Sequence, residues 1–402
     1  MKPLHYYFIG TGCWFVSYGI QSVIFAWLVT IVLRESPNMM GIAQMTLLLP
    51  TTFLLLIGGS LADHFGGKPI AILAQVFAAF CVFFLMVVIH FDQFSYSALL
   101  LFAFAMGCAQ ALVTPARDGL LALVAEGRIQ RTVLKVTLIQ FGVQMLGFLI
   151  ASFADSAGAV IVLGFQMASL LLGAVALQRI QIPAHTRGSP DHPSFRHLLL
   201  SIKAGIVTVR QSPSMSTVVM MNCAMAVFFM GSYMVTVPLL IREVYGGTSA
   251  QLSGVNTANG IGLMLMVLYL LRLGYIRRQG RALILAHAAG AIALATASLG
   301  LGFGALIVSL GCWGMSGGAA VTMSRTIMQE QAPPDQRARV MALFSLSFMG
   351  AGPLGALYCG MMVQWLGPET TLLVNATAMF IVVTLITAKS SLWQLDSGVS
   401  DG

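Results

Sequence analysis

Runs of apolar residues alternate with short polar connections along the whole 402-residue chain. A helix needs about 20 mostly apolar residues to cross the hydrocarbon core of a bilayer, so each run predicts a membrane-spanning helix. Charges and turn residues place the predicted spans at 8–33, 39–61, 69–90, 96–117, 133–154, 157–178, 215–241, 250–271, 282–300, 303–324, 340–365 and 369–388. The pattern therefore predicts an all-α membrane protein with twelve transmembrane helices.

A polar segment after the sixth run divides this pattern into two halves. We expect an N-terminal six-helix bundle at residues 1–178, a cytoplasmic linker at 179–212, a C-terminal bundle at 213–390 and a cytoplasmic tail at 391–402. Within the linker, apolar residues of the segment 195–210 recur at spacings of three and four. This spacing indicates an amphipathic helix in the membrane interface, and a cytosolic extension of the seventh span is the open alternative.

Composition and charge support a membrane location and give the chain an orientation. Only 8% of the residues are charged, 58% are hydrophobic and the mean hydropathy is +0.88. All 21 Lys and Arg residues except Arg34 and Arg242 fall on one side of the predicted spans. Basic residues are retained in the cytoplasm, so we expect a multi-pass protein of the cell (inner) membrane with both termini cytoplasmic. The charges are spread over many short loops, which argues against nucleic-acid binding.

The segment Gly58–Lys68, with the sequence GGSLADHFGGK, predicts a glycine-rich connection between the second and third spans. It resembles the signature between spans two and three of the major facilitator superfamily of secondary transporters. The matching positions are Gly59, Leu61, Ala62, Asp63, Gly66 and Lys68, whereas His64 and Gly67 stand where the family usually has basic residues. Further matching segments are 27–30 with 36–37 and Gly41, 115–117 and 350–355. Together they resemble the branch of drug, siderophore and lysophospholipid carriers.

The resemblance implies two pseudo-symmetric six-helix bundles that work by alternating access. A weak internal repeat agrees with it, because the segment 114–118 corresponds to Ser324 and Arg325 at an offset of about 207 residues. A substrate site between the halves, near mid-membrane, is the expected consequence.

The resemblance also suggests a gate. We expect Asp63 to cap the N-terminus of the eleventh span or to pair with Arg117, and a static helix cap is the alternative. The positions that we assign to gating and conformational change are Gly59, Asp63, Gly66, Lys68, Arg117, Asp118, Arg325, Gly352 and Pro353.

By the same analogy, spans one, four, seven and ten line the substrate cavity. Helical spacing selects aromatic, thioether, amide and hydroxyl side chains on these spans: Trp14, Tyr18, Gln21, Phe25, Met106, Gln110, Thr114, Asn222, Phe229, Tyr233, Trp313 and Ser316. Such groups suit an apolar or amphipathic organic compound, although ordinary helix packing is the alternative for each of them.

Function follows from what the spans contain and what they lack. We find no charge near the middle of any span, no G-x-x-x-x-G-K-[ST] nucleotide motif, no H-E-x-x-H and no metal-ligand spacing. We therefore expect no enzyme activity, no cofactor and no metal. The predicted function is proton-linked export of small amphipathic organic compounds by a monomer in the lipid bilayer. Proton coupling is implied by the resemblance alone, with Asp63, Asp118 and Asp155 as the carboxylates to test. A lysophospholipid or nutrient transporter of the same fold, or a non-transporting sensor, stays open.

Overall fold

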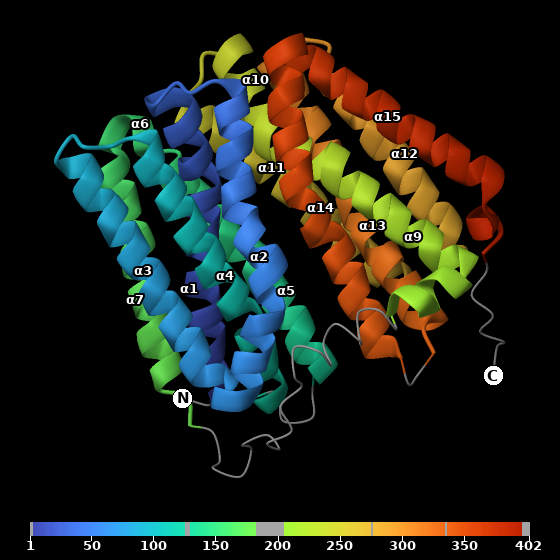
Figure 1. Ribbon diagram of the computed structural model, residues 1–402, viewed down its shortest axis with the longest axis horizontal. Helices are drawn as coiled ribbons and strands as arrows, with labels where there is room; N and C mark the ends of the chain where they lie inside the picture. The colour runs from blue at the N-terminus through green and yellow to red at the C-terminus, as the bar shows by residue number, and fades with distance from the viewer. Residues whose placement is uncertain (1–2, 125–128, 182–204, 275, 334–335, 396–402) are drawn as a thin grey trace. The chain divides into compact units, whose positions relative to one another are not determined.

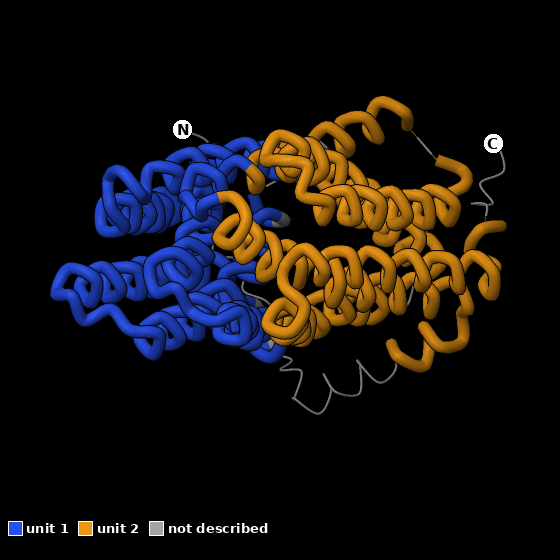
Figure 2. Tube along the Cα trace, turned by 90° about the horizontal axis from the view of Figure 1, so that it is seen from above, with its two compact units in different colours: residues 1–192, 246–254 blue, residues 193–245, 255–402 orange. Residues whose placement is uncertain are grey.

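The computed structural model describes residues 3–124, 129–181, 205–274, 276–333 and 336–395. These residues are helical almost throughout, and none of them forms a strand (Figure 1). The chain divides into two compact units, of which unit 1 comprises residues 1–192 and 246–254 and unit 2 comprises 193–245 and 255–402 (Figure 2).

Unit 1 is built from the N-terminal helices. In chain order these are α1 (Pro3–Trp27) with the π-helical turn η1 (Leu28–Val32), α2 (Pro37–Phe65), α3 (Gly67–His90), α4 (Tyr96–Val124), α5 (Ile129–Ala151), the short α6 (Ala154–Ala157) and α7 (Ala159–Gln178).

Unit 2 begins with a segment in which α-helical and π-helical stretches follow one another. It runs through α9 (Pro213–Ala224), the π-helices η3 (Met225–Met230) and η4 (Ser232–Thr236), and α10 (Val237–Val244). The next helix, α11 (Ser249–Leu273), begins in unit 1 and continues in unit 2. The remaining elements are α12 (Gln279–Ala297), α13 (Phe303–Gln331), α14 (Arg337–Leu366), α15 (Pro368–Lys389) and the 3-10 turn η5 (Ser391–Gln394).

Among the described residues, eleven helical segments are long and apolar enough to cross a membrane, and the shorter apolar stretch Lys135–Ala151 makes a twelfth. The predicted all-α architecture is therefore confirmed. Several helices run past the apolar runs, as α4 does to Val124 and α13 to Gln331. Polar residues can extend these helices because each added turn satisfies its own backbone hydrogen bonds.

The prediction of a loop over Gly58–Lys68 is wrong. Helix α2 continues to Phe65, Gly66 alone breaks the chain with a φ of +89°, and α3 begins at the next residue. The earlier glycines serve packing, because a Cβ on Gly58 would lie 2.5 Å from the carbonyl oxygen of Ala111 in α4. Asp63 lies on the last turns of α2, and its side chain is outside the described part of the structure.

The linker prediction is covered only at its end. Residues 182–204 lie outside the described part, whereas residues 205–211 are helical. This turn packs on the start of α14, where the Thr208 hydroxyl donates to the Gln336 side chain and a Cβ on Gly205 would lie 3.1 Å from the Arg339 carbonyl oxygen.

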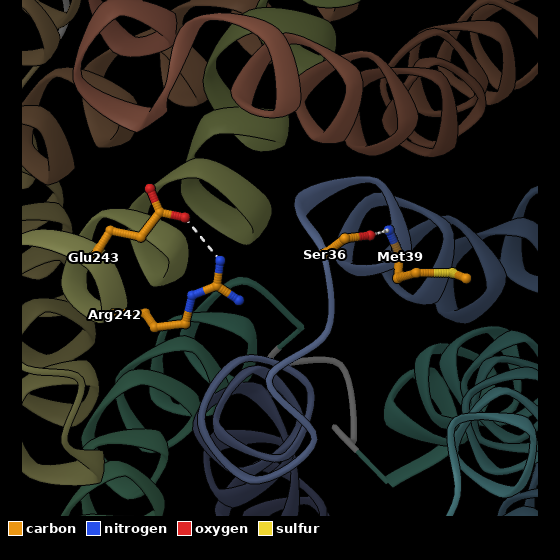
Figure 3. A network of polar contacts seen from close by, with 4 residues as sticks. All are labelled: Ser36, Met39, Arg242 and Glu243. Carbon is orange, nitrogen blue, oxygen red and sulfur yellow. Dashed lines mark hydrogen bonds and ion pairs between the residues drawn. The ribbon is translucent and has the colours of Figure 1, made fainter.

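Ser-Pro pairs start two of the long helical segments. The Ser36 hydroxyl accepts a hydrogen bond from the Met39 amide at the beginning of α2 (Figure 3), and the Ser212 hydroxyl accepts one from Met215 at the beginning of α9. Proline follows each serine at the first helical position, where a backbone N–H would have no acceptor within the helix. At the far end of the α9–α10 segment, Arg242 pairs with Glu243 at 2.7 Å (Figure 3).

The two units repeat one close helix crossing. A Cβ on Gly147 of α5 would lie 2.3 Å from a backbone oxygen of α1 and 2.9 Å from the Cα of Gly19. In unit 2, a Cβ on Gly231 would lie 2.5 Å from the backbone oxygen of Gly355 in α14. The glycines stand 212 and 208 residues apart, close to the offset read from the sequence. Small residues let helix backbones approach in this way in membrane proteins.

A buried polar bridge repeats as well. The Gln166 side chain of α7 donates to Gln21 of α1 at 2.8 Å, and the Asn375 side chain of α15 donates to the Ser232 hydroxyl of η4 at 2.8 Å. Each bridge joins the first helical segment of its half to the last one. The internal repeat is therefore present in side-chain contacts within each unit.

Candidate functional site

Unit 2 contains a cavity of about 220 Å³ between the π-helical segment η3–η4, α11, α13 and α14. Its lining includes the rings of Phe229, Tyr233 and Trp313, two methionines, and the Asn259 amide. None of the described residues that line it carries a charge. Mostly apolar walls with a few placed polar groups are typical of small-molecule sites.

The π-helical backbone helps to place two of these rings. Phe229 lies in η3 and Tyr233 in η4, four residues apart, and both side chains line the cavity. Side chains four residues apart lie on one face of an α-helix, and the π-helical turns keep them there. The short π-helical segments thus present two aromatic rings side by side.

The three rings hold each other in place. Phe229 meets Trp313 edge to face at 5.6 Å between centroids and 90°, and Tyr233 meets the same indole at 6.0 Å and 75°. Edge-to-face pairs are a preferred arrangement of aromatic side chains. Trp313, which is 5% exposed, is therefore the centre of a fixed aromatic wall.

Hydrogen bonds fix the polar groups beside this wall. The Tyr233 hydroxyl donates to the Asn256 side-chain oxygen at 2.5 Å, and the Asn259 amide nitrogen donates to the Leu310 carbonyl at 3.2 Å. The side-chain oxygen of Asn259 accepts no hydrogen bond from the described residues. The cavity therefore offers a bound compound one oriented acceptor.

Helix α12 supports the aromatic wall from behind. His287 is 1% exposed and stacks on Phe229 with 6.3 Å between centroids and 21° between planes. Its Nδ1 donates to the Leu283 carbonyl at 2.9 Å, and its Nε2 is buried without a hydrogen-bond partner among the described residues. One turn on, a Cβ on Gly290 would lie 2.9 Å from Cε2 of Phe229.

The structure brings together three of the C-terminal residues that the sequence assigned to a cavity, namely Phe229, Tyr233 and Trp313. The other two, Asn222 and Ser316, are not in the lining of this cavity. Asn222 is buried and donates to the Phe344 carbonyl at 3.1 Å and the Ser347 hydroxyl at 2.8 Å, both in α14. Ser316 is buried and donates to the Cys312 carbonyl of its own helix at 3.0 Å.

The N-terminal residues that the sequence assigned to a cavity lie within unit 1. Trp14, Gln21, Phe25 and Met106 are buried, and Tyr18, Gln110 and Thr114 are half-buried. Gln21 uses its side-chain oxygen to bind Gln166, and the Thr114 hydroxyl donates to the Gln110 carbonyl at 2.9 Å.

Of the residues assigned to gating, Lys68 has the clearest contacts. Its ammonium group donates to the carbonyls of Gln178 and Ile180 at 2.8 and 2.6 Å, where α7 ends. A cation at a helix C-terminus satisfies exposed carbonyl groups and opposes the helix dipole. Lys68 thus joins α3 to α7 within unit 1.

Arg117 lies on α4, which continues past it. Its guanidinium group sits 4.5 Å above the Phe15 ring, and its backbone carbonyl accepts a hydrogen bond from the Tyr7 hydroxyl at 3.2 Å. Among the other gating candidates, Asp118 and Arg325 are exposed, Gly59 and Gly66 are half-buried, and Gly352 and Pro353 are buried within the unbroken helix α14.

Asp155 has contacts that its sequence neighbourhood did not indicate. One carboxylate oxygen accepts a hydrogen bond from the Trp27 indole at 2.8 Å, and the other accepts from the Ser249 amide at 2.5 Å and its hydroxyl at 2.7 Å. The Ser249 hydroxyl also lies 2.9 Å from the Ser152 carbonyl. Asp155 therefore caps the first turn of α11 within unit 1. Sequence separations of 94 and 128 residues gave no signal for this cluster.

Comparisons with known proteins agree with the fold. The family model described as the Major Facilitator Superfamily matches residues 7–356. An uncharacterized MFS-type transporter, YfiS of Bacillus subtilis (strain 168), is 25% identical over 375 residues, which cover 89% of this chain and 86% of the relative.

Solved transporters share the same arrangement of helices. The nucleoside transporter NupG superposes with a TM-score of 0.76 at 15% identity, covering 96% of this chain and 99% of that one. An auto-inhibited POT family peptide transporter gives 0.74 at 13% identity, with 100% and 99% covered. At these identities the likeness concerns the fold alone.

Proposed function

Because this chain belongs to the Major Facilitator Superfamily, we propose that its transport activity exports small, uncharged or amphipathic organic compounds through the cell membrane. Its family and its apolar helices make it a multi-pass membrane transporter and not an enzyme.

One observation carries the proposed substrate class. The cavity of unit 2 combines three interlocked aromatic rings with an amide acceptor, and no described lining residue is charged. An ionic substrate would be poorly stabilised there, since a charge removed from water needs a partner charge. A lysophospholipid headgroup or a charged nutrient fits this lining less well than a neutral amphipathic compound does.

The proposed mechanism is alternating access of a monomer with both termini in the cytoplasm. Protons are the proposed coupling ion, and Asp63, Asp118 and Asp155 are the carboxylates that we assign to test. Of these, Asp155 accepts three hydrogen bonds at the start of α11.

Transport by purified protein in liposomes tests the proposal. We expect accumulation of uncharged aromatic alcohols to require an imposed proton gradient and to fall about tenfold or more in Trp313→Ala, because the central ring of the wall is lost. Trp365→Ala is the matched control, since Trp365 belongs to the same unit and is 70% exposed. Equal flux in the two variants would refute the cavity as the substrate site, and gradient-independent flux would refute proton coupling.

A further inference from the structure

We propose that Gly290 and His287 of α12 set the size limit of the cavity in unit 2 by holding the Phe229 ring. The ligand class that we infer is a flat, uncharged aromatic ring that carries a hydroxyl or N–H donor. This inference deepens the proposed function, because it takes the same cavity as the binding site. It assigns a specificity role to a helix that contributes no residue to the cavity lining.

Gly290 gives the Phe229 ring its space. A Cβ built on Gly290 would lie 2.9 Å from Cε2 and 3.2 Å from Cζ of that ring, closer than carbon atoms normally approach. Any larger residue must therefore displace the ring. His287 stacks against Phe229, Trp313 contacts the ring edge to face, and the ring itself lines the cavity, so we infer that the displaced ring moves into the cavity.

His287 fixes the same ring from its face. The imidazole is held by its hydrogen bond to the Leu283 carbonyl and stacks nearly parallel to Phe229. Because His287 and Gly290 are three residues apart on α12, their side-chain positions lie on the same face of the helix. Removal of the imidazole would leave space behind Phe229 into which its ring can withdraw.

The lining of the cavity indicates the ligand chemistry. Flat rings gain most from edge-to-face contact with a wall of three aromatic side chains. The Asn259 side-chain oxygen, which has no hydrogen-bond donor among the described residues, can accept a proton donor on the ligand. The cavity of about 220 Å³ is smaller than the roughly 300–1,000 Å³ typical of drug-sized sites. A few added carbon atoms on the ligand should therefore change binding strongly.

A size series of aromatic alcohols tests the inference on the purified full-length protein. Benzyl alcohol, 2-naphthalenemethanol and 1-pyrenemethanol share one benzylic hydroxyl and differ in ring number. Their binding can be measured in detergent by isothermal titration, which requires no transport. We expect Gly290→Ala to weaken the largest bound alcohol about tenfold more than the smallest, and His287→Ala to shift the preference toward larger alcohols.

Three control variants separate size selection from general damage. Gly304→Ala makes the same change at a helical position of α13 where a Cβ meets nothing within 4 Å, and should leave the size order unchanged. Gly317→Ala adds a Cβ to the cavity lining itself and should resemble Gly290→Ala. His287→Phe keeps a ring behind Phe229 and should retain the wild-type order even if His287→Ala does not fold.

The outcomes distinguish this inference from the proposed function. A Gly290→Ala variant that weakens all sizes equally, or none, overturns the inference, as does an unchanged size order in a folded His287→Ala. Failure of wild-type protein to bind any of the three alcohols overturns the ligand class. Size-dependent binding without transport would instead refute the proposed export and leave the role of α12 intact.

Discussion

The close crossing of α1 and α5 makes a sharp prediction about stability. We expect Gly147→Ala to destabilise the protein and Gly142→Ala, on the same helix, to leave it as stable or more so. A Cβ on Gly147 would lie 2.3 Å from the Val16 carbonyl oxygen and 2.9 Å from the Gly19 Cα, whereas a Cβ on Gly142 meets nothing within 4 Å. The obstructing atoms at Gly147 belong to the backbone, so no side-chain rotation relieves the contact.

The size of the effect follows from these distances. To bring the nearest contact from 2.3 Å to the ordinary range that starts at 3.4 Å, the two helices must separate by about 1 Å. Overpacking of this kind costs about 1–3 kcal/mol. Both variants gain the same helix propensity of about 0.8–1.0 kcal/mol from replacing glycine by alanine, so that gain cancels in the comparison. We expect Gly147→Ala to be less stable than Gly142→Ala by about 1–3 kcal/mol.

Thermal unfolding of the two purified variants in one detergent, at one scan rate, measures this difference. Each kcal/mol corresponds to a shift of about 2–4 °C in Tm for a domain of this size. A constant scan rate matters because membrane proteins often unfold irreversibly and their Tm then depends on it. Equal Tm values for the two variants would refute the backbone contact as the reason for glycine at position 147.

Three further predictions concern polar contacts. Asp155→Asn should lower Tm by about 2–4 °C, because a carboxylate that accepts three hydrogen bonds is replaced by an amide with one acceptor atom. Asp92→Asn, in an exposed turn, should leave Tm unchanged. Lys68→Met should lower Tm and Lys68→Arg should restore most of it, since the cation binds two carbonyls at the end of α7. Burial, together with the negative charge of Glu369, raises the pKa of Tyr245 above its ordinary value of 10.0. The neutral Tyr245 phenol therefore contributes to stability below about pH 10, and this contribution is lost as the pH rises through the raised pKa. Tyr245→Phe should therefore show a smaller fall in Tm between about pH 9 and pH 11 than the wild type, and an equal fall would contradict this assignment.

The membrane spans could be predicted because the bilayer imposes a length on each apolar run. The segment from Gly58 to Gly67 could not, because glycine marks both turns and close helix packing. In this chain, Gly58 faces the Ala111 carbonyl of α4 inside a continuous helix, and only Gly66 takes a backbone conformation that breaks it. The distinction depends on a neighbouring helix more than 50 residues away, which a local pattern does not contain.

Some residues of the candidate site could likewise be predicted from the sequence, and others could not. Phe229, Tyr233 and Trp313 were predicted from residue type and helical spacing, and they do line one cavity. Asn222 was placed on the same face because seven residues make about two α-helical turns. The intervening π-helix η3 changes that phase, and Asn222 contacts α14. His287 lay in the predicted ninth span, but its contact with Phe229 joins residues 58 apart in sequence and had no local signal.

The internal repeat explains why the aromatic wall belongs to unit 2. At the offset of 212 residues that relates Gly19 to Gly231, Gln21 corresponds to Tyr233, so the same place in the fold holds an amide in unit 1 and a ring in unit 2. In unit 1 that amide makes the buried bridge to α7, through Gln166. In unit 2 the equivalent bridge to α15 starts one residue earlier, at Ser232. Because Ser232 makes the bridge, position 233 can carry an aromatic ring that lines the cavity. The two units thus keep one packing scheme, and the displaced bridge leaves room for an aromatic lining residue in unit 2.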